Sequence, residues 1–449
     1  MPAAPRQKAD VSHPCMEHSA MMPAWTLLAD VYAGSEAIRQ GCSVYLPRHS
    51  QEPIEAYQER INLALTYDFV RQTTAELAGR AFSKPPQWSE MKEGSKWKDF
   101  LADTDARQRD ANNVARGLFN DGLLFGRVWV YIEIINDRPT WTALDPRDVL
   151  FIATDTTGKI TEARFRREVV KLDGFEEIIS EEIVRITLDR VETWTKPGKK
   201  WERTANVKNA SGIVPLISFA PEPDGAVNCV PPLLDLAELT LTHARRLSEL
   251  ETILRVASFP MLALTTSDGS ETSNFVVGPH TLIALEIDGD AKYVEHSGAA
   301  IGVLQSSLKD LEERAASFGV RLLKRRRPSV ETATAASIAG QEASAPLQGH
   351  VIALQDMLRQ LIAMTAKLWP AGGEPPTVTL SVDFLPTEGT SQDLIAIRQL
   401  GDISRFDMMA ELKRRGVLSP LFDNTLNEAR LSDEAPFFIN ARKGHDHDA

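Results

Sequence analysis

The sequence has few cysteines, no net positive charge and no long apolar run. Its three cysteines are far apart and form no Cys-x-x-Cys pair: Cys15, Cys42 and Cys229. We therefore expect neither a disulfide framework nor a zinc knuckle, and a reducing cytoplasm fits this composition. No segment approaches the roughly 18 uninterrupted apolar residues of a membrane span, and the first residues lack the apolar run of a signal peptide. The sequence therefore predicts neither secretion by that route nor a membrane-spanning protein.

Motifs of catalysis and cofactor binding are also missing. The sequence has no Gly-x-Gly-x-x-Gly after a strand, no phosphate-binding loop that ends in Gly-Lys-Ser or Gly-Lys-Thr, and no Gly-x-Ser-x-Gly elbow. His445 and His447 have a spacing that suits a metal, but they lie in a polar tail. His296 and Ser297 suggest a base and a nucleophile, yet neighbouring strand residues point to opposite faces. We therefore expect no enzyme activity, no metal and no cofactor; a hydrolase with an unrecognised site is the least favoured alternative.

The chain is acidic overall but contains one cluster of basic residues. The 449 residues include 50 Lys and Arg and 62 Asp and Glu, a net charge of −12, which argues against non-specific binding to nucleic acid. Four consecutive cations interrupt this pattern: Lys324, Arg325, Arg326 and Arg327. They form either a solvated loop or a loop that touches phosphate oxygens without reading bases. No aromatic residue is interleaved with them, so base stacking is not supported.

The first half of the chain changes from helical to strand periodicity. Apolar residues at helical spacing predict helices at 25–40, 54–77 and 105–121, the second ending at Gly79, and residues 45–48 have an extended pattern. From Val128 the apolar residues alternate, as in a strand. Further strands are predicted at 140–144, 149–152, 163–170, 183–195 and 200–208. We therefore expect a mostly antiparallel sheet over 126–219 and an α+β fold.

The second half is mainly helical. The pattern predicts helices at 233–258, 304–320 and 331–369, with short strands between 261 and 295 separating the first two. A strand at 377–385 follows, and then helices at 391–401, 405–416 and 421–431, with Ser404 as the N-cap of the second. The polar tail from Asn440 is expected to be disordered.

The helix at 331–369 is long and contains a proline. About 35 residues would span on the order of 50 Å. Pro346, with Gly340 and Gly349 nearby, removes a backbone hydrogen bond and crowds the preceding turn, which predicts a kink. The alternative is two separate helices that meet at 344–346.

Seven segments, in their order and spacing, resemble a branch of the portal proteins of tailed bacteriophages. They are Tyr45-Leu46-Pro47-Arg48, Leu123-Leu124-Phe125-Gly126-Arg127, Pro231-Pro232-Leu233-Leu234-Asp235-Leu236, Val277-Gly278-Pro279, Val294-Glu295-His296-Ser297-Gly298, residues 311–319, and Glu331-Thr332-Ala333-Thr334-Ala335-Ala336. The resemblance implies a homo-oligomeric ring, commonly a dodecamer, at one capsid vertex of the virion, assembled in the host cytoplasm. It also implies a channel for double-stranded DNA in packaging and ejection. The implied partners are the terminase large subunit, the major capsid protein and a head–tail adaptor, with no membrane.

The resemblance also implies a division of the chain. Residues 1–230 would form the wing, 231–259 a stem helix, 260–303 the clip, 304–320 a second stem helix and 321–330 the tunnel loop. Residues 331–386 would form the long kinked helix and a return strand to the wing, and 387–449 a short helical crown with a disordered tail. Lys324 to Arg327 would face the DNA, although some of them can pair with Glu312, Glu313 or Glu331 of a neighbour. Another head–tail structural protein of a phage is the main alternative.

Overall fold

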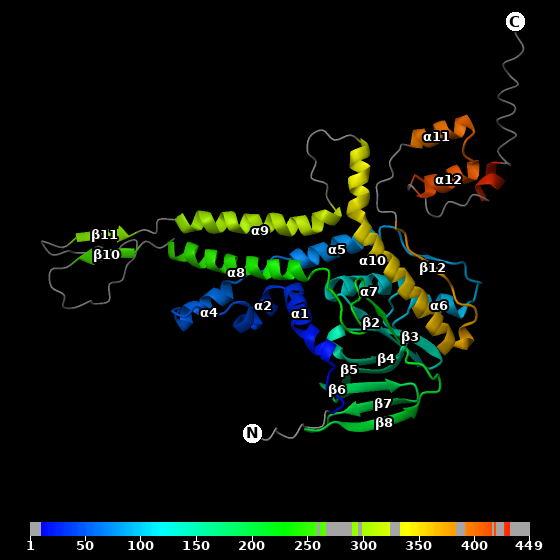
Figure 1. The fold of residues 1–449 in the computed structure, drawn as a ribbon, viewed down its shortest axis with the longest axis horizontal. Helices are drawn as coiled ribbons and strands as arrows, with labels where there is room; N and C mark the ends of the chain where they lie inside the picture. The colour runs from blue at the N-terminus through cyan, green and yellow to red at the C-terminus, as the bar shows by residue number, and fades with distance from the viewer. Residues whose placement is uncertain are drawn as a thin grey trace, which may run out of the picture. The chain divides into compact units, whose positions relative to one another are not determined.

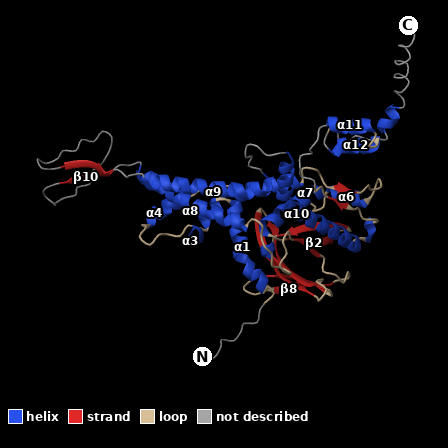
Figure 2. Ribbon diagram, turned by 45° about the horizontal axis from the view of Figure 1, so that its top comes forward, coloured by secondary structure: helices blue, strands red, loops and turns tan. Residues whose placement is uncertain are grey.

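The computed structural model describes residues 10–257, 261–265, 290–294, 299–323, 333–382, 391–414, 417–418 and 426–431. The chain divides into two compact units, Met1–Val382 and Asp383–Ala449. The first unit contains helices and antiparallel strands, mostly in separate runs along the chain, and the described elements of the second are helices (Figures 1 and 2). The α+β fold predicted from the sequence is therefore confirmed.

Seven helices precede the main sheets. They are α1 (Met16–Ala33), α2 (Ser35–Gln40), α3 (Cys42–Tyr45), α4 (Ile54–Leu63), α5 (Phe69–Ala81), α6 (Lys96–Ala102) and α7 (Ala111–Phe125). The helix predicted at 25–40 begins earlier and is interrupted at Gly34, whose φ of 96° lies outside helical geometry. Tyr45, expected to be extended, ends the short helix α3.

The single helix predicted at 54–77 is wrong, because two helices occupy this range. Between α4 and α5 the amide of Thr66 donates to Ser35 Oγ at 2.9 Å, and the ring of Tyr67 packs on His243 with centroids 4.7 Å apart. These tertiary contacts outweigh the local helical periodicity. Gly79, expected as the end, lies inside α5, which ends at Ala81 with Phe82 as its C-cap.

Helix α7 begins later than the sequence predicts. Ala106 and Gln108 have positive φ angles, so the stretch before Asp110 is not helical. The carboxylate of Asp110 accepts from the amide of Asn113 at 2.8 Å and caps the helix. At the other end, Gly126 adopts the left-handed conformation that ends many helices.

Two antiparallel sheets follow α7. Strands β2 (Val128–Ile135), β3 (Arg138–Leu144) and β9 (Leu216–Phe219) form one, in the order β3-β2-β9. The other has the order β4-β5-β6-β7-β8, with β4 (Val149–Thr154), β5 (Ile160–Asp173), β6 (Glu176–Thr187), β7 (Arg190–Thr195) and β8 (Glu202–Lys208). The predicted antiparallel pairing is confirmed. The strand predicted at 183–195 is two strands, with Thr187 Oγ1 accepting from the amide of Arg190 at 3.0 Å in the turn between them.

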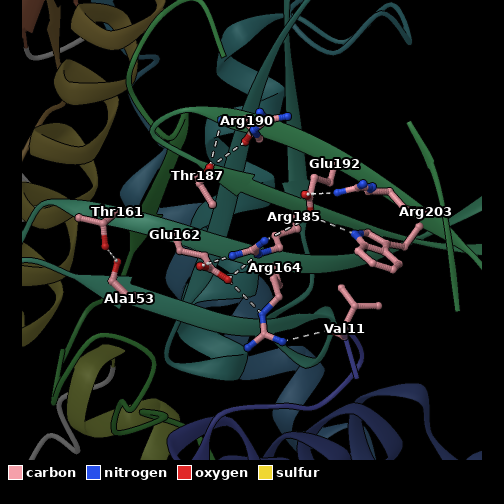
Figure 3. A network of polar contacts seen from close by, with 11 residues as sticks. Val11, Ala153, Thr161, Glu162, Arg164, Arg185, Thr187, Arg190, Glu192 and Arg203 are labelled. Atoms are coloured by element: carbon pink, nitrogen blue, oxygen red, sulfur yellow. Dashed lines mark hydrogen bonds and ion pairs between the residues drawn. The ribbon is translucent and has the colours of Figure 1, made fainter. Parts of the chain in front are cut away.

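A line of ion pairs crosses the five-stranded sheet (Figure 3). Arg185 on β6 donates to Glu162 on β5 at 2.9 Å and to Glu192 on β7 at 3.3 Å, and Arg203 on β8 donates to Glu192 at 3.0 Å. Burial would raise the pKa of Glu192, but hydrogen bonds from Arg203, Trp194 and Arg185 hold it below its ordinary value. Each contact joins adjacent strands, so the network favours one register of the sheet.

The remaining elements are mostly helices. They are α8 (Leu234–Ala257), β10 (Met261–Thr265), β11 (Asp290–Val294), α9 (Ala299–Leu323) and α10 (Ala333–Leu368). The strand predicted at 377–385 is reduced to β12 (Val378–Thr379), which pairs with an unpredicted strand β1 (Gln87–Trp88); residues from 383 onward in that prediction lie outside the described chain.

The second unit contains α11 (Ser391–Leu400), α12 (Arg405–Arg414) and a helical turn at 426–431. Ser404 caps α12 as predicted, because its Oγ accepts from the amide of Asp407 at 3.0 Å. The tail from Asn440 lies outside the described residues.

Asp121, near the end of α7, lowers the stability of the fold in a pH-dependent way. Burial, and then the charge of Asp145, raise its pKa from 3.8 to about 6. Because the pKa of this acid is higher in the folded than in the unfolded chain, the contribution of Asp121 to stability is most favourable below pH 3.8 and falls as the pH rises to 6.

We therefore expect Asp121→Asn to raise the free energy of unfolding at pH 8 by up to about 3 kcal/mol, and by little at pH 3.5. Urea titrations of both proteins at the two pH values measure this difference. Asp155→Asn, on the exposed turn before β5, is the control and lacks a gain at pH 8, because hydrogen bonds to Thr157 and Lys159 lower the pKa of that carboxyl. An equal gain from Asp121→Asn at both pH values would contradict the assignment.

Candidate functional site

Helices α8 and α9 lie side by side in opposite directions. His243 Nε2 on α8 meets Glu312 Oε1 on α9 at 3.2 Å, and farther along α8 Arg246 donates to Ser307 Oγ. The partner number falls as the α8 number rises, so the two helices are antiparallel. At 1.5 Å per residue each helix is roughly 36 Å long. The strands between them in the chain, β10 and β11, are therefore attached at one common end of the pair.

Each of the two helices has a set of buried, mostly apolar side chains. Leu236, His243 and Leu250 are buried on α8, whereas Leu239 and Leu254 are only half-buried. Among the described side chains of α9, the buried residues are Leu308, Leu311 and Ala315. Burial of this stripe is the main favourable term that holds the pair together.

His243 joins three elements. Its ring stacks at a tilt on Tyr67 and meets the edge of Phe69 at a centroid distance of 5.4 Å, while Nε2 reaches Glu312 on α9. The sequence places His243 among the apolar residues of a predicted helix, so its position on this face can be predicted. Its aromatic partners, Tyr67 and Phe69, cannot be predicted, because they lie more than 170 residues away in the chain.

The polar face of α8 is also anchored. Arg245 Nε donates to the carbonyl of Tyr45 at 2.7 Å, and Arg255 pairs with Glu59 at 3.0 Å. Tyr45 itself donates to Asp30 at 2.5 Å, and burial followed by this carboxylate raises the pKa of its hydroxyl. The helices α1, α3 and α4 therefore hold α8 in place.

The β pair between the two helices is short. Strands β10 and β11 are antiparallel, with Met261 opposite Val294 and Thr265 opposite Asp290. Predicted strand segments at 276–277 and 281–287 lie outside the described residues, as do Glu295, His296 and Ser297.

The boundaries predicted for α9 are wrong at both ends. The helix begins at Ala299 instead of 304 and continues through Leu323, whereas the predicted helix ended at 320 and a loop was expected at 321–330. Residues 321–323 therefore continue the helix by nearly one more turn than predicted. The basic residues Lys324, Arg325, Arg326 and Arg327 lie outside the described chain.

Helix α10 is continuous across its proline. It contains Pro346 within Ala333–Leu368, so the structure gives one helix where two that meet at 344–346 were the alternative. In Figure 1 its axis changes direction along its length. Gly340 lies in its backbone, and a Cβ added at Gly349 would meet no atom within 4 Å.

The second half of α10 is part of the core. Its buried residues recur at helical spacing: Leu347, Val351, Leu354, Met357, Leu358, Leu361, Ile362 and Thr365. His350 lies 3.6 Å from Glu222; burial lowers the pKa of His350, and the Glu222 charge opposes this. The second half of α10 therefore packs into the core beside β9.

Two further features bear on function. Within the described ranges, His, Cys, Asp and Glu side chains form no group of three that would suit a metal ion. None of the helices among these residues combines the length and apolarity that a membrane span requires.

Comparison with known proteins places one match on this part of the chain. The family described as a domain of unknown function (DUF4055) matches residues 232–369, which run from α8 to the end of α10. None of the curated proteins matches the chain.

Among solved structures, the chain is similar to a chain of the "neck of empty GTA particle computed with C6 symmetry". The identity is 13%, the TM-score 0.41, and the match covers 86% of this chain and 95% of that one. A chain of the virion of a native gene transfer agent (GTA) particle matches with 14% identity, a TM-score of 0.40 and coverages of 86% and 95%. A chain of the neck of a native GTA particle computed with C12 symmetry matches with 14% identity, a TM-score of 0.38 and coverages of 77% and 89%. Such low identities and TM-scores assign no function to this chain.

Proposed function

We propose that this chain is a non-enzymatic portal subunit of a tailed phage or phage-like particle. Twelve copies form a ring at one capsid vertex, around a channel through which double-stranded DNA is packaged and ejected. The observation that carries the proposal is the antiparallel α8–α9 pair with a β pair at its end, followed in the chain by the 36-residue helix α10. This order matches the stem, clip and long helix that the sequence resemblance implies.

The exposed side of α9 suits a channel wall. Among its described side chains the exposed charges are balanced, with Lys309 and Arg314 against Asp310 and Glu313. Each phosphate that a protein neutralises adds affinity for DNA, so a wall without net positive charge lets the duplex slide. The net charge of −12 for the whole chain acts in the same direction.

The parts of the ring then have separate partners. The β10–β11 end of the stem meets the terminase large subunit during packaging and the head–tail adaptor afterwards. The helices and sheets of 1–230, together with α10, form the wing that faces the major capsid protein. Lys324 to Arg327 follow α9 directly and form the tunnel loop that touches DNA phosphates.

The first test is the assembly state of the purified chain. Negative-stain images and native mass spectrometry are expected to give a closed ring of twelve 49.7 kDa subunits with a central hole. Monomers without a hole at every concentration would overturn the proposal. Particles that lack the chain should contain no DNA; filled heads without tails would instead identify another head–tail structural protein.

The basic cluster provides a second prediction. Replacing Arg325, Arg326 and Arg327 with alanine is expected to leave ring assembly intact and to reduce packaged DNA or its retention, because three phosphate contacts per subunit are lost. Quantitative PCR of nuclease-protected DNA measures the effect. The matched control removes the same charge from exposed positions of the β7–β8 loop and of β8, through Lys199, Lys200 and Lys208 to alanine. Equal DNA content in the two triple variants would argue against the loop contact.

A further inference from the structure

The hairpin between β5 and β6 ends in a rigid apolar tip. Asp173 pairs with Glu176, so the loop consists of Gly174 and Phe175 alone, and Gly174 has a φ of 64°. A glycine with positive φ at the first loop position is typical of the tight turns that match the twist of the strands. Phe175 is fully exposed at this turn. A tight turn thus holds a phenyl ring in water, which is unfavourable unless another surface covers it.

The strands below the tip are exposed as well. Val170, Leu172, Ile178 and Ile179 all face solvent. Val170 and Ile179 are opposite each other in the register and therefore share one face of the hairpin. Three carboxylates surround the phenyl ring in sequence, Asp173, Glu176 and Glu177, with Lys171 as the nearest cation. The tip is therefore apolar at its end and acidic around it.

A cavity of about 540 Å³ lies at the other end of β5. Its apolar wall includes Ile160 at the start of β5 and Met364 on α10. Three cations also line it, Arg127, Lys159 and Lys367, and no Asp or Glu is present among the described residues of its lining. The cavity is therefore complementary in charge and polarity to the hairpin tip.

The buried cation of this cavity, Arg127, has no carboxylate among its hydrogen-bond partners. Arg127 is 4% exposed, and the acceptors of its guanidinium are neutral: Ser218 Oγ and the carbonyls of Gly225 and Asn228. Burial lowers its pKa, as expected for a charge without a carboxylate in contact. Trp129, also in the lining, has an indole N–H that meets no acceptor in the part of the chain that the structure describes. The site therefore favours an anionic group with an apolar body.

The tip and the cavity of one molecule cannot meet. They lie at opposite ends of β5, whose 14 residues span roughly 45 Å at 3.3 Å per residue. A contact between them must therefore join two copies in a head-to-tail manner. Such a contact uses two different surfaces and closes into a ring when the rotation between copies allows it.

We propose that the β5–β6 hairpin tip of one subunit inserts Phe175 into the cavity between β5, β9 and α10 of the next subunit. The carboxylates of Glu176 and Glu177 then face Lys159 and Lys367, and the phenyl ring covers the apolar wall. This inference rests on the proposed ring and identifies the contact that builds it. Because the two surfaces differ, each subunit offers one tip and one cavity.

Removal of the phenyl ring tests the contact. Phe175→Ala in the full-length chain is expected to raise the concentration for half-assembly of rings about 30-fold, as for an aromatic residue central to an interface. The thermal unfolding of the dissociated subunit should not change, because the side chain is fully exposed. Val207→Ala, an exposed apolar residue on β8 of the same sheet, is the matched control and should assemble like the wild type. Mass photometry over a dilution series measures both.

Charge exchange tests the pairing of the two surfaces. Glu176→Lys with Glu177→Lys, and separately Lys159→Glu with Lys367→Glu, should each weaken assembly by at least about tenfold. The chain with all four changes should regain most of the affinity, since every interface again joins opposite charges. A second probe is cross-linking: Phe175→Cys mixed with Ala363→Cys should give disulfide dimers, and a chain with both changes a ladder of higher oligomers.

The outcomes separate this contact from the ring itself. Rings that tolerate Phe175→Ala at unchanged concentration, or charge-reversed surfaces that fail to rescue each other, would overturn the hairpin contact and leave the portal ring standing. A wild-type chain that forms no ring would overturn both.

Discussion

Gly126→Ala is expected to lower the free energy of unfolding by about 2–5 kcal/mol. Gly126 has a φ of 75°, a left-handed conformation that costs alanine about 1–2 kcal/mol. The added Cβ would also lie 2.8 Å from the Cα of Pro231 and 3.0 Å from the sulfur of Cys229. A backbone atom cannot rotate away as a side chain can, so the overpacking adds about 1–3 kcal/mol. Urea titration with fluorescence detection measures the loss.

Gly158→Ala is the matched control for this prediction. Gly158 has a similar φ of 80°, but a Cβ there would meet no atom within 4 Å. Its cost should therefore be limited to the conformational term, about 1–2 kcal/mol. If both variants lose the same free energy, the close approach of Gly126 to Pro231 contributes nothing.

Gly126 also brings together two segments that the sequence singles out. The stretch Leu123–Arg127 ends α7 and enters β2, and Pro231 stands immediately before α8. More than 100 residues separate them in the chain, yet Gly126 lies against Pro231. The start of α8 is thus fixed by the α7–β2 junction, which explains why only glycine fits there.

Most elements of this fold are predictable because they follow local periodicity. Helices α8 and α10, the alternation that begins at Val128 and the cap at Ser404 depend on neighbours in the sequence. Errors occur where distant contacts decide the structure. The break between α4 and α5 follows from Ser35 and His243, and no pattern within 54–81 reports their presence.

In the candidate site, too, the features that follow local periodicity were predictable and those that depend on distant contacts were not. Helices α8 and α9 and their buried faces could be predicted from apolar spacing, and so could the long helix α10. The partners of His243 and Arg245 could not, since these contacts span 69 to 200 residues. The role of Lys324 to Arg327 stays a prediction. The hairpin tip was also missed, because exposure of Phe175 depends on the pairing of Asp173 with Glu176 and not on periodicity.

Trp141 on β3 holds α10 against the sheet. It is 1% exposed, and its indole N–H donates to Thr365 Oγ1 on α10 at 2.9 Å. Its ring meets the face of Phe100 at a centroid distance of 5.2 Å, in a cluster that also includes Trp97 and Trp369. This cluster joins α6, β3 and the end of α10. The position of α10 in the proposed ring therefore depends on it.

Trp141→Ala is expected to lower the free energy of unfolding by about 3–5 kcal/mol, because it leaves a large cavity between β3 and α10. Trp141→Phe keeps part of the ring and should cost less; Thr365 Oγ1 then still donates to the carbonyl of Leu361 at 2.7 Å. Trp201→Ala, at a half-buried position beside the outer strand β8, is the matched control and should cost far less. Urea titration gives the energies, and hydrogen exchange should show the largest loss of protection at 347–368. A Trp141→Ala loss no larger than that of Trp201→Ala would show that α10 is held by other contacts.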